Sequence, residues 1–283
     1  MKRILVVGDV MLDHYISGVV ERQSPEADVP VLLKERDWYT PGGAANTAIN
    51  IVAMGIEVDL VAPGGGLIAR KLLLDHLLHE AGVNTKLSDT GSIPVKTRFV
   101  TEGHHHLLRM DEEKLLKAEL FHLCVQEEYD VIVVADYAKG AVSPKLMDCL
   151  KQLGPPIIVD PKPENSIMYY GIDMACPNLH EWELMLVQGN SICTHMGDVI
   201  VTRGSGGIEV ITEDVRVRLA SNPIDVVDVC GAGDTVTAVM AVCKAMGKDV
   251  VQSAKVALKC AEWVITQPGT VPVTKEVFER NLV

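Results

Sequence analysis

Long hydrophobic runs, basic charge and paired cysteines are all scarce in this sequence. No apolar stretch among its 283 residues approaches the roughly 20 residues needed to cross a bilayer, so no membrane span is expected. Its 26 Lys and Arg residues face 38 Asp and Glu residues, which gives a net charge of −12. General binders of nucleic acid or anionic membranes present clustered Lys and Arg, so neither is an expected partner.

The seven cysteines stand singly, with no CxxC pair. This pattern is typical of reduced, mostly buried thiols, and we expect a cytoplasmic protein. Gly8 and Asp9 interrupt the basic and apolar N-terminus and no small-residue cleavage site follows, which favours a first strand over a signal peptide. No GxxxxGK[ST] loop occurs and no GxGxxG follows the first strand, which excludes the usual P-loop and dinucleotide sites.

What is present is a 48% hydrophobic chain whose length suits one α/β domain, and we expect residues 1–283 to form a single domain. Short β-rich apolar segments alternate with segments of helical periodicity, which predicts a mostly parallel sheet with helices on both faces. The expected strands are residues 4–7, 131–135, 157–160, 174–176, 199–202 and 226–229. The expected helices are residues 44–54, 68–81, 144–153, 180–187, 235–246 and 250–265.

Residues 15–39 and 93–111 break this alternation, because they are strand-like and have no helix beside them. We expect them to pair as a small separate sheet, a candidate lid over an active site. Tyr15, Trp38 and Tyr39 lie in these segments. Packing within the lid or against a dimer partner is favoured for them over stacking on a base.

The stretch VVDVCGAGDTVTAVMA, residues 226–241, is the first candidate site. A β-branched run meets a turn at Gly231, Ala232 and Gly233, and a helix follows. Backbone N–H groups and the positive end of the helix dipole then converge on one place, which suits an anion. Asp234 is interpreted either as a plain N-cap or as a base beside that anion, and the spacing fits both roles.

The motif PGGAAN, residues 41–46, is the second candidate site. Gly42 and Gly43 allow a ligand to approach the backbone, and Asn46 both donates and accepts hydrogen bonds, as recognition of a polyol requires. Tight helix packing is the alternative explanation of the paired glycines, and this motif alone favours it.

Taken together, several motifs resemble the ribokinase-like (PfkB) carbohydrate kinases: GAGD, PGGAAN, PNLHEWE at residues 177–183 and VTRGSGG at residues 201–207. In chain order, GDVMLDHY, SPEADVPV, DYAKGA, VDPK and VCGAGDT are similar to the heptose 7-phosphate kinases of that family. The resemblance covers nearly the whole chain. It implies a three-layer ribokinase-like fold with a small β-sheet lid. It also implies ATP-dependent phosphorylation of the anomeric hydroxyl of D-glycero-β-D-manno-heptose 7-phosphate, for lipopolysaccharide heptose synthesis.

The resemblance also implies a role for each matching residue. Asp234 is the implied base, and the implied anion hole consists of the amides of Gly231, Ala232 and Gly233. Near Mg²⁺ and the nucleotide phosphates it places Asn178 and Glu181, the latter acting on the metal through water. The other implied ATP contacts are Thr202, Arg203, Gly204 and Gly207. The implied contacts to the sugar phosphate are Asp13, Gly42, Gly43, Asn46, Arg109, Asp136, Lys139 and Lys162.

A few placed cations allow an acidic protein to bind an anionic sugar. Lys139 of DYAKGA and Lys162 of VDPK are the cations expected to hold phosphate, with solvated loop lysine as the alternative. Arg109 is expected to add a charge at the 7-phosphate. The implied oligomer is a homodimer through the lid strands, because exposed edge strands need a partner.

Some features depart from the family pattern. APGGGLIA at residues 62–69 replaces an acidic turn, residues 183–201 are too few for the strand and helix usually found there, and Cys230 replaces a threonine. A weakly active kinase, a sugar-phosphate-binding protein and a kinase for another sugar or nucleoside are therefore alternatives. The run HHH at residues 104–106 alternates faces on a strand, so a solvated lid turn is favoured over a metal cluster, with sugar-phosphate contact as the alternative.

Overall fold

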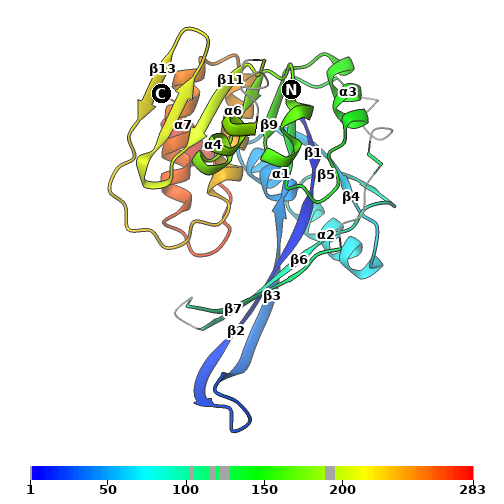
Figure 1. Ribbon diagram of the computed structural model, residues 1–283, viewed down its shortest axis with the longest axis vertical. Helices are drawn as coiled ribbons and strands as arrows, with labels where there is room; N and C mark the ends of the chain where they lie inside the picture. The colour runs from blue at the N-terminus through cyan, green and yellow to red at the C-terminus, as the bar shows by residue number, and fades with distance from the viewer. Residues whose placement is uncertain (1, 102–104, 115–118, 121–127, 189–194, 283) are drawn as a thin grey trace.

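Two sheets organise the computed structural model (Figure 1), which describes residues 2–101, 105–114, 119–120, 128–188 and 195–282. The larger sheet has the strand order β13-β12-β11-β10-β9-β8-β1-β4-β5. Neighbouring strands are parallel except in the hairpins that join β11, β12 and β13. Its strands are β1 (Arg3–Gly8), β4 (Glu57–Pro63), β5 (Asn84–Ser88), β8 (Val131–Ala135), β9 (Ile157–Asp160), β10 (Met174–Ala175), β11 (Asp198–Thr202), β12 (Ile208–Ile211) and β13 (Arg216–Leu219).

Helices cover both faces of this sheet because its central strands are apolar on both sides. In β1, Val6 packs into one hydrophobic core and Val7 into the other. One face carries α1 (Ala44–Ala53), α2 (Ile68–Glu80), α6 (Ala232–Ala245), α7 (Val250–Val264) and α8 (Lys275–Asn281). The other carries α3 (Pro144–Leu153), the 3₁₀ helix η2 (Pro163–Tyr169) and α4 (Leu179–Gln188). The three layers predicted from the alternating pattern are confirmed.

Several helices begin and end at capping residues. The Ser143 hydroxyl accepts a hydrogen bond from Leu146 N at 3.3 Å at the start of α3, and Pro144 is the first helical residue. The same helix ends at Gly154, whose φ of 94° is left-handed. Asp249 caps α7 in the same way as Ser143 caps α3. None of the helices in the described ranges has the length and apolar character needed to cross a bilayer.

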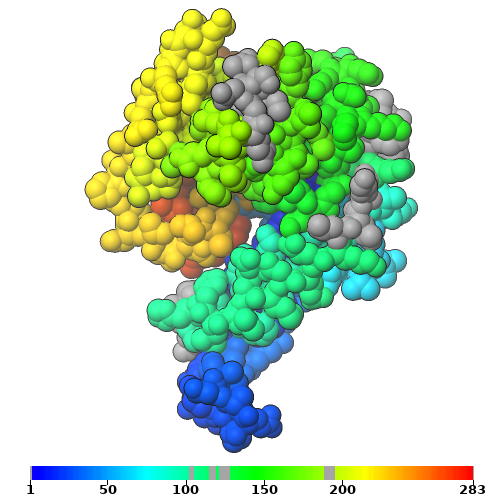
Figure 2. All heavy atoms as spheres, viewed as in Figure 1, coloured from blue at the N-terminus to red at the C-terminus, as the bar shows by residue number. Residues whose placement is uncertain are grey.

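A four-stranded sheet projects from the α/β body (Figures 1 and 2). Its order is β3-β2-β6-β7, and its strands are β2 (Val10–Gln23), β3 (Pro30–Gly43), β6 (Val95–Thr101) and β7 (His106–Glu112). The prediction of a small separate sheet from residues 15–39 and 93–111 is confirmed, although β2 and β3 are longer than expected. β1 continues into β2, and β3 runs into α1. The start of β2 at Val10 pairs with Gly43 at the end of β3, so both strands join the α/β body at the PGGAAN motif.

The predicted strand at residues 226–229 is wrong. Val227 N and Asp228 N donate to Ile265 O at 2.9 and 3.2 Å, so this backbone is tied to the C-terminal end of α7 rather than to a strand. Its three valine side chains are more than half exposed. The β-branched composition indicated a strand, but the hydrogen-bond partners came from a helix far along the chain.

Candidate active site

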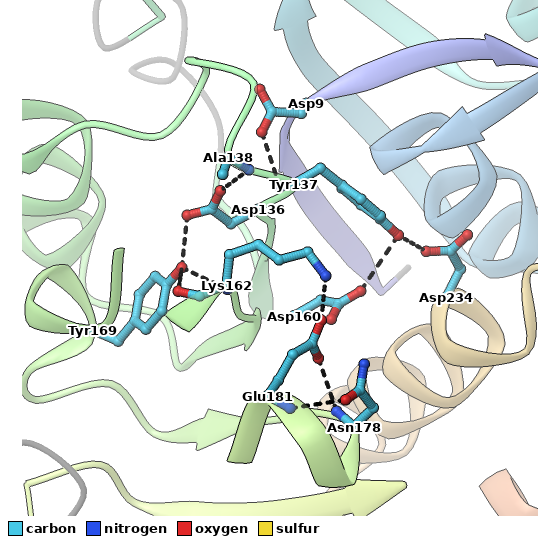
Figure 3. Close-up of polar contacts among 10 residues, drawn as sticks. All are labelled: Asp9, Asp136, Tyr137, Ala138, Asp160, Lys162, Tyr169, Asn178, Glu181 and Asp234. Atoms are coloured by element: carbon cyan, nitrogen blue, oxygen red, sulfur yellow. Dashed lines mark hydrogen bonds and ion pairs between the residues drawn. The ribbon is translucent and has the colours of Figure 1, made fainter. Parts of the chain in front are cut away.

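Asp234 is the third residue of α6, and Gly231 is the N-cap, so the plain N-cap interpretation of Asp234 is wrong. The Asp234 carboxylate is buried. It accepts a hydrogen bond from Asn46 Nδ2 at 2.7 Å. Figure 3 shows the second hydrogen bond that it accepts, from the Tyr137 hydroxyl. Burial raises the pKa of Asp234, and the hydrogen bonds from Asn46 and Tyr137 oppose that shift. A fixed carboxylate with a raised pKa is suited to act as a base.

The first turn of α6 opens into a cavity of about 660 Å³. No side chain in the described ranges caps this helix, and Ala232 N makes only a long bond of 3.4 Å to Val229 O, so the first turn can bind an anion. Ala232 and Gly233 line the cavity on the α6 side, and Thr202, Gly204 and Gly207 line it on the β11 side. Apolar walls come from Ile208, Val236, Leu258 and Ile265. Five of the residues predicted to bind phosphate or nucleotide therefore surround one cavity.

Close packing explains Gly231 of GAGD and both glycines of PGGAAN. Gly231 has a φ of 80°, and a Cβ there would lie 2.8 Å from Asn46 Nδ2. At Gly43, with a φ of 63°, a Cβ would meet a backbone carbonyl oxygen at 2.5 Å. At Gly42 a Cβ would meet Asp13 Oδ2 at 2.5 Å. The PGGAAN glycines thus bring β3 against β2 and place Asp13 next to the same motif.

A second cavity, of about 340 Å³, lies between the four-stranded sheet and two loops, residues 226–229 and 268–270. Tyr15 and Trp38 form part of its wall and stack with their ring centroids 5.2 Å apart. The Thr40 hydroxyl, on the same wall, is buried and has no hydrogen-bond partner among the described residues. An aromatic wall with an unpaired hydroxyl suits a polyhydroxy ligand.

Arg98 is a cation of this region that the sequence analysis missed. It lies opposite Tyr15 across β2 and β6, forms an ion pair with Asp13, and places its guanidinium 5.3 Å from the Tyr15 ring centroid. Arg109 is opposite Arg98 on β7, but it is 58% exposed and pairs with Asp111 at 2.9 Å. The only sequence signal for Arg98 was its position within the second strand-like segment.

Tyr137 extends from the loop after β8 into the centre of the site (Figure 3). Its hydroxyl donates to Asp234 and lies 3.5 Å from Asp160 Oδ2, at the end of β9. Burial, and next the negative charge of Asp234, raises the pKa of both Tyr137 and Asp160 well above their ordinary values. Neither residue was predicted from the sequence, although Asp160 ends β9 and Tyr137 lies two residues after the end of β8, where ligand-binding polar residues are expected.

Lys162 connects this centre to the start of α4. Its Nζ forms an ion pair with Glu181 Oε1 and lies 5.4 Å from the Tyr137 ring centroid (Figure 3). Glu181 Oε2 accepts from Asn178 N, and Asn178 Oδ1 accepts from Glu181 N, both at 2.9 Å. This reciprocal pair is a capping box, so the NxxE motif also has a structural function. Burial disfavours the charge of Lys162, but Glu181 outweighs that effect and raises the pKa of Lys162.

Asp136, predicted to contact the substrate, is fully buried. Its carboxylate accepts from Ala138 N at 2.7 Å, from Asn165 Nδ2 at 2.8 Å and from the Tyr169 hydroxyl at 2.6 Å. These bonds give Asp136 a structural role in the loop after β8, and its contact with the substrate stays a prediction. The buried Asp9 carboxylate accepts from the backbone N–H groups of Tyr137, Lys139 and Ala141. Together the two carboxylates shape the DYAKGA loop.

Two other predicted cations are held by carboxylates. Lys139 Nζ lies 2.7 Å from Glu113 Oε2, with the lysine side chain 22% exposed. Arg203 Nη1 lies 3.0 Å from Glu209 Oε2 on β12, whereas the neighbours of Arg203 in the chain line the larger cavity. Arg203 therefore pairs with β12, next to residues that line the cavity. To bind phosphate, Lys139 must exchange Glu113 for the phosphate or share its charge between the two.

Some predictions fall partly outside the described residues, because these omit His104 and residues 189–194. His105 and His106 are exposed. In the parts of the chain that the structure describes, no group of three or more His, Cys, Asp or Glu side chains is arranged to hold a metal ion. Cys230, the departure beside GAGD, has a thiol whose pKa is raised to about 11 by burial and then by Asp228.

Comparison with curated proteins finds relatives of greater length. The bifunctional protein HldE of Hydrogenovibrio crunogenus is 36% identical over 310 residues, covering 99% of this chain and 62% of the relative. HldE of Halorhodospira halophila is 34% identical over 302 residues, covering 99% of this chain and 63% of the relative. The chain thus spans less than two thirds of the length of these relatives.

Comparison with solved structures finds the same fold. Ribokinase from Thermotoga maritima superposes with a TM-score of 0.77 at 18% identity, covering 100% of this chain and 99% of that one. The tetrameric inhibited form of phosphofructokinase-2 from Escherichia coli gives a TM-score of 0.81 at 16% identity, covering 99% and 98%. The ribokinase-like fold expected from the sequence is confirmed. Because the model described as pfkB family carbohydrate kinase matches residues 1–276, the chain belongs to that family and is an ATP-dependent sugar kinase.

Proposed function

We propose that the chain transfers the γ-phosphoryl group of ATP to the anomeric hydroxyl of D-glycero-β-D-manno-heptose 7-phosphate, for lipopolysaccharide heptose synthesis. The observation that carries the proposal is the buried Asp234 carboxylate. It belongs to the open first turn of α6 and is hydrogen-bonded to Asn46 of PGGAAN. The choice of a heptose phosphate is supported by the motifs SPEADVPV and DYAKGA and by the HldE relatives, which align with 99% of this chain.

In the proposed reaction, Asp234 takes the proton of the anomeric hydroxyl while the oxygen of that hydroxyl attacks the γ-phosphorus. The bond from the γ-phosphorus to the bridging oxygen breaks, and ADP leaves. The amides of Gly231, Ala232 and Gly233 and the positive end of α6 stabilise the charge on the transferring group. A base and an anion site on the same helix turn serve both ends of this transfer.

The nucleotide is proposed to occupy the 660 Å³ cavity, which combines an open helix terminus with apolar walls for the base. Its proposed contacts are Thr202, Gly204 and Gly207. Both oxygens of Glu181 already accept, from Lys162 and from Asn178 N. This arrangement fits a Mg²⁺ ion that keeps water ligands and binds phosphate oxygens, with Glu181 reaching it through water. When bound, the ion would neutralise phosphate charge.

The sugar phosphate is proposed to lie between α6 and the four-stranded sheet, next to the 340 Å³ cavity. Its hydroxyl groups would contact Asp13, Gly42, Gly43 and Asn46. Its phosphate would contact Lys139, Lys162 and Arg109. Since Lys139 and Lys162 both have carboxylate partners, Glu113 and Glu181, phosphate binding would replace these ion pairs or share the lysines with them.

We propose that both sheets belong to one kinase domain, residues 1–283, because β1 continues into β2 and β3 into α1. The four-stranded sheet would act as a lid that excludes water, so that the sugar rather than water is attacked. Its edge strands β3 and β7 would pair with a second copy in a homodimer.

The test is phosphate transfer from Mg·ATP to a panel containing heptose 7-phosphates, ribose, fructose 6-phosphate and adenosine, with sugar binding measured by calorimetry. Selective turnover of one heptose 7-phosphate supports the proposal. Preference for another acceptor overturns the heptose assignment and keeps the kinase. Binding of the heptose phosphate without turnover overturns the proposed reaction.

A further inference from the structure

The Tyr137 hydroxyl lies between two carboxylates but carries a single proton. It donates to Asp234 Oδ1, and its oxygen is 3.5 Å from Asp160 Oδ2 (Figure 3). Tyr137 can therefore give its proton to Asp160 only if it releases Asp234 or receives a proton from it. A tyrosine that only held Asp234 in place would need a contact to that carboxylate alone, whereas Tyr137 also lies near Asp160.

The backbone around these side chains is held on several sides. Tyr137 N donates to Asp9 Oδ2 at 2.9 Å, and Asp136 N donates to Asp160 O at 3.0 Å. The Asp234 carboxylate is fixed from its other side by Asn46 at 2.7 Å. The order Asp234, Tyr137, Asp160 therefore does not depend on a mobile surface side chain.

We propose that Tyr137 and Asp160 form a proton outlet for Asp234, an inference that rests on the proposed function of Asp234 as the base. The acceptor hydroxyl gives its proton to Asp234. Asp234 then passes a proton to the Tyr137 oxygen while Tyr137 gives its own proton to Asp160, so that Tyr137 stays neutral. Asp160 returns the proton to water before the next turnover. Tyr137 and Asp160 act through Asp234 and are positioning residues.

The charges around the outlet agree with this direction of transfer. Asp160 faces Asp234, Lys162, Glu181 and Asp136, together with the Cys176 thiol. Asp234 faces Asp13 and Lys162 in addition to its hydrogen-bond partners. Burial and the surrounding carboxylates raise the pKa of Asp160, so it holds a proton more strongly than an exposed aspartate. Lys162 opposes that effect and so favours the ionised form of Asp160, which is the form that accepts the proton.

The experiment compares Tyr137→Phe, Asp160→Asn and the double variant, with kcat measured against pH using the panel sugar that is turned over. We expect each single variant to lose roughly ten- to hundredfold in kcat, the range of one hydrogen bond to a charged group. The acid limb of Tyr137→Phe should move to higher pH, because the Asp234 carboxylate loses a donor. The double variant should be no slower than the slower single variant, since both act on one path.

Tyr129→Phe is the matched control, because its hydroxyl also donates to a buried aspartate, Asp59, at 2.7 Å but outside the site. It should keep the wild-type pH profile. A wild-type profile in Tyr137→Phe, or losses that multiply in the double variant, would overturn the outlet. If Tyr137→Phe does not fold, a wild-type kcat in Asp160→Asn would likewise overturn the outlet. Full turnover in Asp234→Asn would instead remove the proposed base itself, which separates the two failures.

Discussion

At the scale of single residues, the acceptor side of the site is crowded with acidic groups. Asp234 is buried, Asp160 and Tyr137 beside it are partly exposed, and Lys162 is a cation that faces them. Burial penalises the charged form of each acid, which keeps the pKa of Asp234 raised. Such a carboxylate binds a transferred proton more readily than an exposed one does, as a base in phosphoryl transfer requires.

Asp234→Asn keeps the shape of the side chain but removes its capacity to take a proton. Turnover should fall by roughly two to four powers of ten, because that is the usual contribution of a general base. Sugar binding by calorimetry should stay near wild type. Asp148→Asn, an exposed change on α3, is the control for a neutral Asp-to-Asn substitution. Near-normal turnover in Asp234→Asn would contradict the base assignment.

Lys139→Ala tests the phosphate contact on the DYAKGA loop. Because Lys139 is only partly exposed and its partner Glu113 stays behind, the variant should bind the phosphorylated sugar roughly ten- to hundredfold more weakly and leave ATP binding almost unchanged. Titration calorimetry with each ligand measures the two effects. Lys255→Ala, an exposed lysine on α7, should change neither affinity. Equal losses for sugar phosphate and ATP in Lys139→Ala would argue against the assignment.

At the scale of elements, the start of α6 is set by glycine geometry. Gly231→Ala places a Cβ against Asn46 at a left-handed φ, and should lower the free energy of unfolding by about 1–3 kcal/mol. At Gly233, two residues on, a Cβ has nothing within 4 Å. Gly233→Ala should be neutral, or stabilise by up to about 1 kcal/mol. Urea unfolding of both variants gives the comparison, and equal stabilities would refute this account of the turn.

One carboxylate joins three strands of the larger sheet. Asp59 on β4 accepts from Arg3 at 2.9 Å, from Tyr129 at 2.7 Å and from Asn84 at 3.3 Å. Burial alone would raise the pKa of Asp59, but Tyr129 and Arg3 outweigh it and the pKa is lowered below 3.8. A lowered pKa stabilises the fold above the unfolded-state pKa and stops doing so as pH falls through the folded-state pKa.

Asp59→Asn should therefore reduce the free energy of unfolding by about 2 kcal/mol at neutral pH, since Arg3 loses its charged partner. The difference from wild type should persist down to about pH 4 and shrink below it. Chemical unfolding at a series of pH values measures both quantities. A difference that stays constant into the acid range would show that Asp59 contributes by shape rather than by charge.

At the scale of the whole molecule, the projecting four-stranded sheet presents edge strands with apolar side chains. Leu33 on β3 and Leu108 on β7 are 45% and 59% exposed. Light scattering should give twice the chain mass of 30.7 kDa, because such edges need a partner. Leu33→Lys combined with Leu108→Lys should give the mass of one chain, whereas Val187→Lys, an exposed position on α4 of the α/β body, should not. A wild-type monomer would refute the proposed homodimer.

Much of the fold and part of the site could be predicted because their signals are local. Apolar strands and helical periodicity are properties of short segments, and they indicated the central strands and most helices with their approximate bounds. The motifs GAGD and VTRGSGG likewise placed Ala232, Gly233, Thr202 and Gly204, which line one cavity. The strands β4, β5, β12 and β13 were not predicted from the sequence.

The sequence by itself thus determined the layered α/β architecture, the separate small sheet and the position of Asp234 at a helix start. Only the tertiary structure decided which charges meet: Arg98 with Asp13, Lys162 with Glu181, and Tyr137 between two carboxylates. It also buried Asp136 and removed the strand expected at residues 226–229. Periodicity and capping depend on neighbours within a few residues. A buried polar contact depends on partners brought together from distant parts of the chain, and a single sequence does not reveal such pairs.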